Sequence, residues 1–130
     1  MLTGATPLQE RNQVMTDLAT GELDILLTTP EYFDFHAEEL AQASAIGFVV
    51  IDEAHHVGTS KAGFRPSYVH LGQSVARLGN PQVLAVTATA DTAVADEIRQ
   101  AFNLDEVVFD NTERANLQVI DQRNTKKRER

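Results

Sequence analysis

Hydrophobic positions along the chain form short continuous runs that alternate with helical spacings. Three runs predict strands, at 23–29, 46–51 and 82–87. The runs 46–51 and 82–87 are almost entirely apolar, which is typical of strands covered on both faces of a sheet. The remaining periodic segments predict helices over 7–20, 36–44, 66–78 and 91–102.

Residues at the helix ends support these boundaries. Thr6, Pro7 and Gln9 match the start of a helix with a capping box, and Gly21 matches its end. Asp91 is expected to cap the last helix. The apolar face of that helix is predicted to contain Ala93, Val94, Ile98, Ala101 and Phe102.

Strands that alternate with helices predict βαβ units, a mainly parallel sheet and the α/β fold class. Residues 106–109 and 117–120 are further short strand candidates. With 130 residues the chain suits one domain. We expect that domain to span 1–121, followed by a basic tail or linker at 122–130.

Charge and composition narrow the range of functions. The net charge is −8, although residues 123–130 contain five basic side chains and one acid. An acidic body argues against strong nucleic-acid binding by this piece alone, because Lys and Arg supply most non-specific affinity. The absence of cysteine excludes disulfides and Cys-based zinc sites. Neither a membrane-spanning run nor a signal peptide is present, so we expect a cytoplasmic location, associated with the nucleoid in a bacterium.

The main chemical feature is Asp52-Glu53-Ala54-His55, directly after the predicted strand 46–51. The carboxyl edge of a parallel sheet is where α/β folds bind their ligands. An Asp at this place can hold Mg²⁺ through water, and a neighbouring Glu can orient or deprotonate an attacking water molecule. The alternative is an Asp-Glu pair that caps a loop and binds no metal.

A second feature is Thr87-Ala88-Thr89, at the end of the predicted strand 82–87. Hydroxyl groups at the end of a neighbouring strand would lie beside the carboxylates and could transmit the nucleotide state to other loops. A helix cap with a turn is the alternative interpretation.

These motifs, in this order and spacing, resemble the RecQ family of superfamily 2 DNA helicases. Residues 49–55 are similar to the Mg²⁺-binding motif II of that family, and 84–90 are similar to motif III. Phe64-Arg65-Pro66-Ser67-Tyr68 is similar to the segment that closes the family's aromatic-rich loop. Weaker matches at 21–33 and 112–117 extend the resemblance over about residues 3–120.

The resemblance implies a partial RecA-like P-loop domain that uses ATP and Mg²⁺ in its parent and acts on DNA. Asp52 would hold Mg²⁺, Glu53 would act as the catalytic base, and His55 would link the hydrolysis site to motif III. Thr87 and Thr89 would relay the nucleotide state. The remaining residues would couple hydrolysis to DNA or contact its backbone, namely Phe64, Arg65, Thr29, Pro30 and Glu31.

The chain departs from the family pattern in two places. Nothing matches G-x-x-x-x-G-K-[ST], the loop that cradles phosphates, so we expect the chain to begin after that loop. The second motor domain would follow residue 130. The chain alone is therefore predicted to hydrolyse no ATP. Residues 56–63 also contain neither the Trp nor the Cys usual in the family, which weakens the expected coupling to DNA.

Loss of the phosphate-loop strand would leave strand 82–87 with an unpaired edge. Either 106–109 closes that gap, or another copy of the chain pairs there. Two functions remain in competition: a fragment of an ATP-driven DNA-unwinding motor in repair or recombination, and a degenerate helicase half that acts as a non-catalytic interaction or regulatory module. Phe64-Arg65-Pro66 disfavours an RNA helicase.

Overall fold

The computed structural model describes residues 1–43, 46–58, 66–110 and 116–117. Its elements are α1 (Leu8–Thr20), α2 (Pro30–Ala43), β1 (Phe48–Ile51), α3 (His55–Gly58), α4 (Pro66–Ala76), β2 (Gln82–Ala85) and α5 (Thr92–Phe102). β1 and β2 pair in parallel, with Phe48 opposite Gln82 and Ile51 opposite Ala85. This confirms the α/β class and the parallel pairing, in a sheet of two strands within the described ranges.

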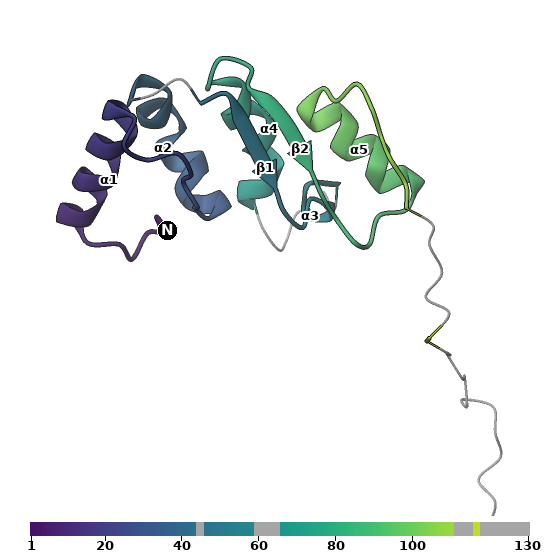
Figure 1. Ribbon diagram of the computed structural model, residues 1–130. Coiled ribbons are helices and arrows are strands. Elements are labelled where there is room, and N and C mark those ends of the chain that lie inside the picture. The colour runs from purple at the N-terminus through teal and green to yellow at the C-terminus, as the bar shows by residue number, and fades with distance from the viewer. Residues whose placement is uncertain (44–45, 59–65, 111–115, 118–130) are drawn as a thin grey trace, which may run out of the picture.

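The helices form a layer on one face of the strand pair. In Figure 1, α4 runs behind β1 and β2, with α1 and α2 to one side and α5 to the other. α2 packs against α4, and α4 packs against α5. The buried core between these helices and the strands includes Phe33, Leu40, Ile51, Leu71, Ile98 and Phe102. Each such apolar side chain contributes about 1.5–3 kcal/mol when it leaves water.

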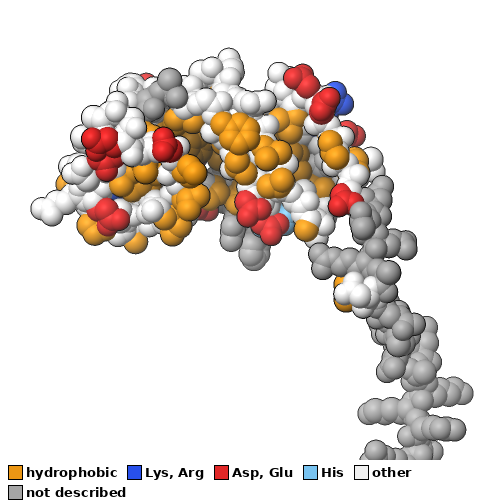
Figure 2. Space-filling model, in the orientation of Figure 1, with side chains coloured by type: hydrophobic (Ala, Val, Ile, Leu, Met, Phe, Trp, Pro, Cys, Tyr) orange, Lys and Arg blue, Asp and Glu red, His pale blue; other side chains and the backbone are white. Residues whose placement is uncertain are grey.

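The exposed face of the strand pair corrects one prediction. Both strands were expected to be covered on both faces, but Phe48 is 53% exposed, Val50 55% and Leu84 47%. The inner side chains Val49 and Val83 pack on the helices instead. Figure 2 shows hydrophobic side chains gathered across this side of the molecule. The prediction was wrong because no described element covers the outer face.

The predicted strand at 23–29 is also wrong. Leu2 and Thr28 form an isolated parallel bridge, and the rest of the segment pairs with no strand among the described residues. Pro30 does not merely end this segment, since it is the first residue of α2, which begins six residues before the predicted helix start. Pro suits a first helical turn because its missing N–H has no helical partner there. An apolar run became a strand only where a neighbour was available.

The helix ends follow the sequence in part. Gly21 ends α1 in the left-handed conformation, and the Asp91 side chain accepts a hydrogen bond of 2.9 Å from the Val94 N–H at the start of α5. The capping box predicted at Thr6 is wrong, because Pro7 occupies the cap position and makes no side-chain cap. Thr6 Oγ1 accepts from the Thr3 N–H instead.

The buried face of α5 is shifted from the predicted one. Ala93 and Ala101 are exposed, while Ala95 is buried together with Ile98 and Phe102. Val94 lies at the margin, partly buried against the core. The spacing alone left the centre of the apolar stripe uncertain by one residue in each direction, and contact with the neighbouring helices decided it.

The C-terminal predictions divide into two groups. Residues 106–109 form no strand, and Val108 is 86% exposed, so they do not close the free edge of β2. Self-association at that edge stays a prediction. Residues 118–120 and the tail at 122–130 lie outside the described residues. None of the helices in the described part of the chain is long and apolar enough to cross a membrane.

Gly72 allows α4 and α5 to approach closely, which gives a test of the helix layer. A Cβ atom at this position would lie 2.1 Å from the Ala101 carbonyl oxygen. Ala favours a helix by about 1 kcal/mol over Gly, but the steric clash outweighs that gain. We expect Gly72→Ala to lower the free energy of unfolding by about 1–3 kcal/mol in urea.

The exposed neighbour Gln73 supplies the control in the same helix. Gln73→Ala is expected to change the free energy of unfolding by less than about 0.5 kcal/mol. Equal stability of the Gly72→Ala variant and the unsubstituted protein would show that α4 and α5 are not packed as described.

Candidate functional site

The candidate site lies where β1 and β2 end side by side. Parallel pairing continues past both strands, because the Val86 N–H donates to the Ile51 carbonyl at 2.9 Å. The Ala54 N–H then donates to the Val86 carbonyl at 3.0 Å, and Ala54 is fully buried. These bonds anchor the loop after β1 to the loop after β2. The two motifs found in the sequence therefore meet at one edge, as expected for parallel strands.

Glu53 has a left-handed backbone conformation, with φ of 50°. Asp52 Oδ1 accepts a hydrogen bond of 2.8 Å from the Glu53 N–H on one side, and the anchored Ala54 follows on the other. A residue with a Cβ atom is strained in this conformation by about 1–2 kcal/mol. The surrounding bonds hold Glu53 there, and its side chain is 57% exposed at the strand end. Strain of this kind is concentrated at functional sites.

His55 connects the two loops through one ring nitrogen. Its Nδ1 lies 3.0 Å from Thr87 Oγ1 and 3.2 Å from Glu53 Oε2. Thr87 Oγ1 in turn accepts from the Thr89 N–H at 3.3 Å. The contacts run from the carboxylate of the first motif through the imidazole to the hydroxyl of the second. A change at Glu53 can therefore reach residue 89 through three polar contacts.

A second histidine, which the sequence gave no reason to select, supports this arrangement. The His56 ring lies 4.1 Å from the His55 ring and 5.3 Å from the Tyr68 ring, measured between centroids. Tyr68 is buried in the core, as expected for a helix residue that packs toward the sheet. His56 therefore links the orientation of His55 to a buried side chain of α4. Its place directly after the motif was the one feature of the sequence that could have indicated this role.

Asp52 is the residue best placed to hold a cation. It is exposed at the end of β1, and one carboxylate oxygen already accepts from the Glu53 N–H. Mg²⁺ usually binds one or two carboxylates, keeps several waters and takes its other ligands from phosphates, so a single exposed Asp fits that chemistry. Within the described ranges, three or more His, Asp or Glu side chains nowhere gather as a complete metal site.

The other candidate residues lie apart from this cluster. Thr29 starts α2, since its Oγ1 accepts from the Tyr32 N–H at 3.3 Å and its carbonyl accepts from Phe33. Thr29 and Pro30 line a groove that Asp52 also lines from β1, while Glu31 follows on the first turn of α2. Phe64 and Arg65 lie outside the described residues. The structure thus joins the two motif loops and keeps residues 29–31 across the groove.

The backbone at Glu53 can be tested by stability measurements. Because Gly adopts a positive φ without strain, we expect Glu53→Gly to be about 1 kcal/mol more stable than Glu53→Ala. Both variants lose the same contact with His55, so the difference isolates the backbone. At the exposed helical residue Glu97 the order reverses, with Gly about 1 kcal/mol less stable than Ala. Chemical unfolding of the four variants would contradict the assignment if both positions gave the same order.

Comparison with known proteins accounts for most of the chain. Residues 1–98 match the DEAD/DEAH box helicase family. The chain is 34% identical over 104 residues to the ATP-dependent DNA helicase RecQ of Haemophilus influenzae, which covers 79% of this chain and 17% of that protein. It is 31% identical over 114 residues to the ATP-dependent DNA helicase Q5 of Mus musculus, covering 82% of this chain and 12% of that protein.

The chain therefore spans less than one fifth of the length of these relatives. The family match includes the site built above, since Asp52, Glu53, His55, Thr87 and Thr89 all fall within residues 1–98. A two-stranded parallel sheet with helices on one side is consistent with part of the RecA-like α/β domain. The chain belongs to the DEAD/DEAH box helicase family, as a RecQ-like member among ATP-dependent DNA helicases.

Proposed function

We propose that this chain supplies the hydrolytic edge of the first motor domain in an ATP-dependent DNA helicase that unwinds DNA in repair or recombination. The observation that supports this most directly is the contact of His55 with both Glu53 and Thr87, at 3.2 and 3.0 Å. A motor must connect the group that acts on water to a group that senses the result. We assign the motor domain to 1–121 and a linker to 122–130.

Asp52 holds Mg²⁺, mainly through water, in this proposal. The ion would supply charge neutralisation at the terminal phosphates of ATP when bound. Glu53 orients the attacking water and accepts its proton, for which an exposed carboxylate at the strand end is suited. His55 positions Glu53 through the contact at Nδ1. Thr87 and Thr89 pass the state of the site to the neighbouring motor domain.

DNA is the proposed partner, which places the protein in the cytoplasm, at the nucleoid in a bacterium. Thr29, Pro30 and Glu31 lie at the start of α2, where backbone and side-chain groups can meet a DNA backbone. Phe64 and Arg65 keep their proposed role in coupling DNA binding to hydrolysis on the basis of the resemblance alone. The 130 residues contain no phosphate-cradling loop, so we propose that they hydrolyse no ATP by themselves.

A second candidate is a non-catalytic interaction module. The exposed apolar side chains on the outer face of β1 and β2 favour it, because patches of this kind mark interaction sites. The strained Glu53 and the His55 contacts favour the motor instead, since a module without catalysis gains nothing from them. ATP turnover separates the two functions.

The first test compares ATP turnover of this chain with that of a longer chain that adds a phosphate loop upstream and a second motor domain downstream. We expect hydrolysis stimulated by single-stranded DNA in the longer chain alone. Glu53→Gln should lower that turnover about 10²–10⁴-fold, because the amide cannot accept the proton from water. Glu97→Gln, an exposed acid on α5, should leave turnover unchanged. Undiminished turnover in the Glu53→Gln variant would rule out this role.

The second test removes the hydroxyl that receives the signal. Thr87→Val keeps the side-chain shape but loses Oγ1, which lies 3.0 Å from His55 Nδ1. We expect the stimulation of ATP turnover by DNA to fall about fivefold or more, while turnover without DNA changes little. Thr87→Ser keeps the hydroxyl and should keep the stimulation. Equal stimulation in the Val and Ser variants would show that the contact transmits nothing.

A further inference from the structure

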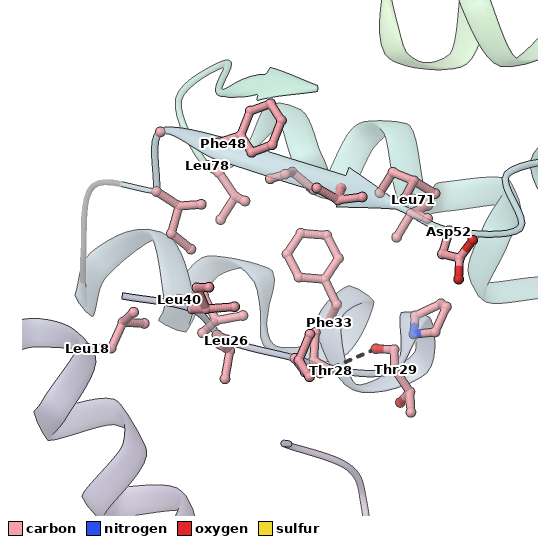
Figure 3. Close-up of a pocket in the computed structure, with 18 of the residues that line it drawn as sticks. Leu18, Leu26, Thr28, Thr29, Phe33, Leu40, Phe48, Asp52, Leu71 and Leu78 are labelled. Atoms are coloured by element: carbon pink, nitrogen blue, oxygen red, sulfur yellow. Dashed lines mark hydrogen bonds between the residues drawn. The ribbon is translucent and has the colours of Figure 1, made fainter. Parts of the chain in front are cut away.

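A groove of about 860 Å³ runs between the segment 23–29 and β1, and the proposed hydrolytic function does not use it. Figure 3 shows the order of residues along its two walls: Leu26, Thr28 and Thr29 on one, Phe48 to Asp52 on the other. Both walls run in the same direction. Their separation explains why the segment 23–29 forms no strand with β1.

The helices form a continuous floor beneath this groove. Phe33 and Leu40 of α2 line it on one side, and Leu71 of α4 lines it on the other. α2 and α4 contact each other directly, with the Ser74 hydroxyl donating to Asp34. The helical layer is therefore complete, whereas the layer of strands above it has a gap. Such a gap between two parallel extended segments matches the place of one further strand.

Backbone groups face the gap from both walls. The carbonyls of Gly47 and Ile51 accept hydrogen bonds from β2. Since successive residues of a strand direct these groups to opposite sides, those of Phe48 and Val50 point to the groove. On the other wall the Leu27 carbonyl accepts from the Leu2 N–H at 2.8 Å. The trans peptide then directs the Thr28 N–H toward the groove.

The side chains around the groove define what it would accept. Ile25 is 74% exposed and Phe48 53%, on opposite walls, so apolar surface flanks the gap. A strand between them would bury its side chains against the helices on one face and join these apolar groups on the other. Both faces of that strand must therefore be apolar.

The charges at the groove are of one sign. Among the described residues that line it, the charged ones are Asp24, near the start of one wall, and Asp52, at the end of the other. Two acids at opposite ends favour basic residues at both ends of a bound segment. β1 has four residues, about 13 Å of strand, which sets the length of the apolar middle at four or five residues.

We propose that this groove binds one extended segment of a partner polypeptide, parallel to β1, apolar through its middle and basic at both ends. Main-chain hydrogen bonds to Val50 and Thr28 hold the segment, as in other cases of strand addition to a sheet edge. The binding does not require ATP or the hydrolytic residues, so it can be tested on the 130-residue chain without reference to the motor function.

The probe is a fluorescein-labelled peptide, Lys-Thr-Val-Val-Ile-Val-Thr-Lys-amide, titrated with the chain and followed by fluorescence anisotropy. We expect saturable binding. Replacing the central Ile of the peptide by Pro removes an N–H and prevents strand pairing, so that affinity should fall at least about tenfold. No binding, or equal binding of the two peptides, would overturn the proposal.

Charge reversal at the groove separates specific insertion from general stickiness. Asp24→Lys should weaken the Lys-ended peptide about fivefold and strengthen a Glu-ended version of it. Asp96→Lys changes the net charge equally, but on an exposed position of α5, and should affect neither peptide. Equal effects of the two substitutions would overturn the proposal. So would a dimer that Val50→Lys dissociates while the monomer binds no peptide, since the groove would then hold a second copy.

Discussion

The parallel pairing of β1 with β2 is the interaction on which the functional site depends. It extends past the strands through the bonds from Val86 to Ile51 and from Ala54 to Val86. Residues that are more than thirty positions apart in sequence thereby share one register, and His55 lies within 3.0 Å of Thr87. Any substitution that shifts this register would separate the two motifs even if every side chain of the site were intact.

Coverage on one side only has a structural consequence. The helices bury the inner side chains of the strands, and the outer ones remain exposed together with the open edge of β1. The proposed strand-binding groove and the proposed hydrolytic site meet at Asp52, which lines the first and begins the second. A segment bound in the groove would therefore end beside the carboxylate proposed to hold Mg²⁺. The two proposals concern different surfaces that share one residue.

Much of the local structure followed from residues close together in the chain. The cap at Asp91, the left-handed end at Gly21 and the positions of β1 and β2 depend on neighbours within a few residues. The failed predictions depend on distant neighbours. The segment 23–29 needed a strand beside it, and the burial of Phe48 and Val50 needed a cover for the outer face. Hydrophobic pattern indicates what a segment can become, while pairing and coverage come from elsewhere in the molecule.

The sequence by itself determined the α/β class, the Asp-Glu-Ala-His and Thr-Ala-Thr motifs and the resemblance to RecQ helicases, because these reside in residue types and their order. Only the tertiary structure decided the strained backbone of Glu53, the shared contact of His55 with Glu53 and Thr87, and the groove between the segment 23–29 and β1. Each of these depends on hydrogen bonds or packing between segments that are far apart in the chain, and no local pattern of residues encodes such distances.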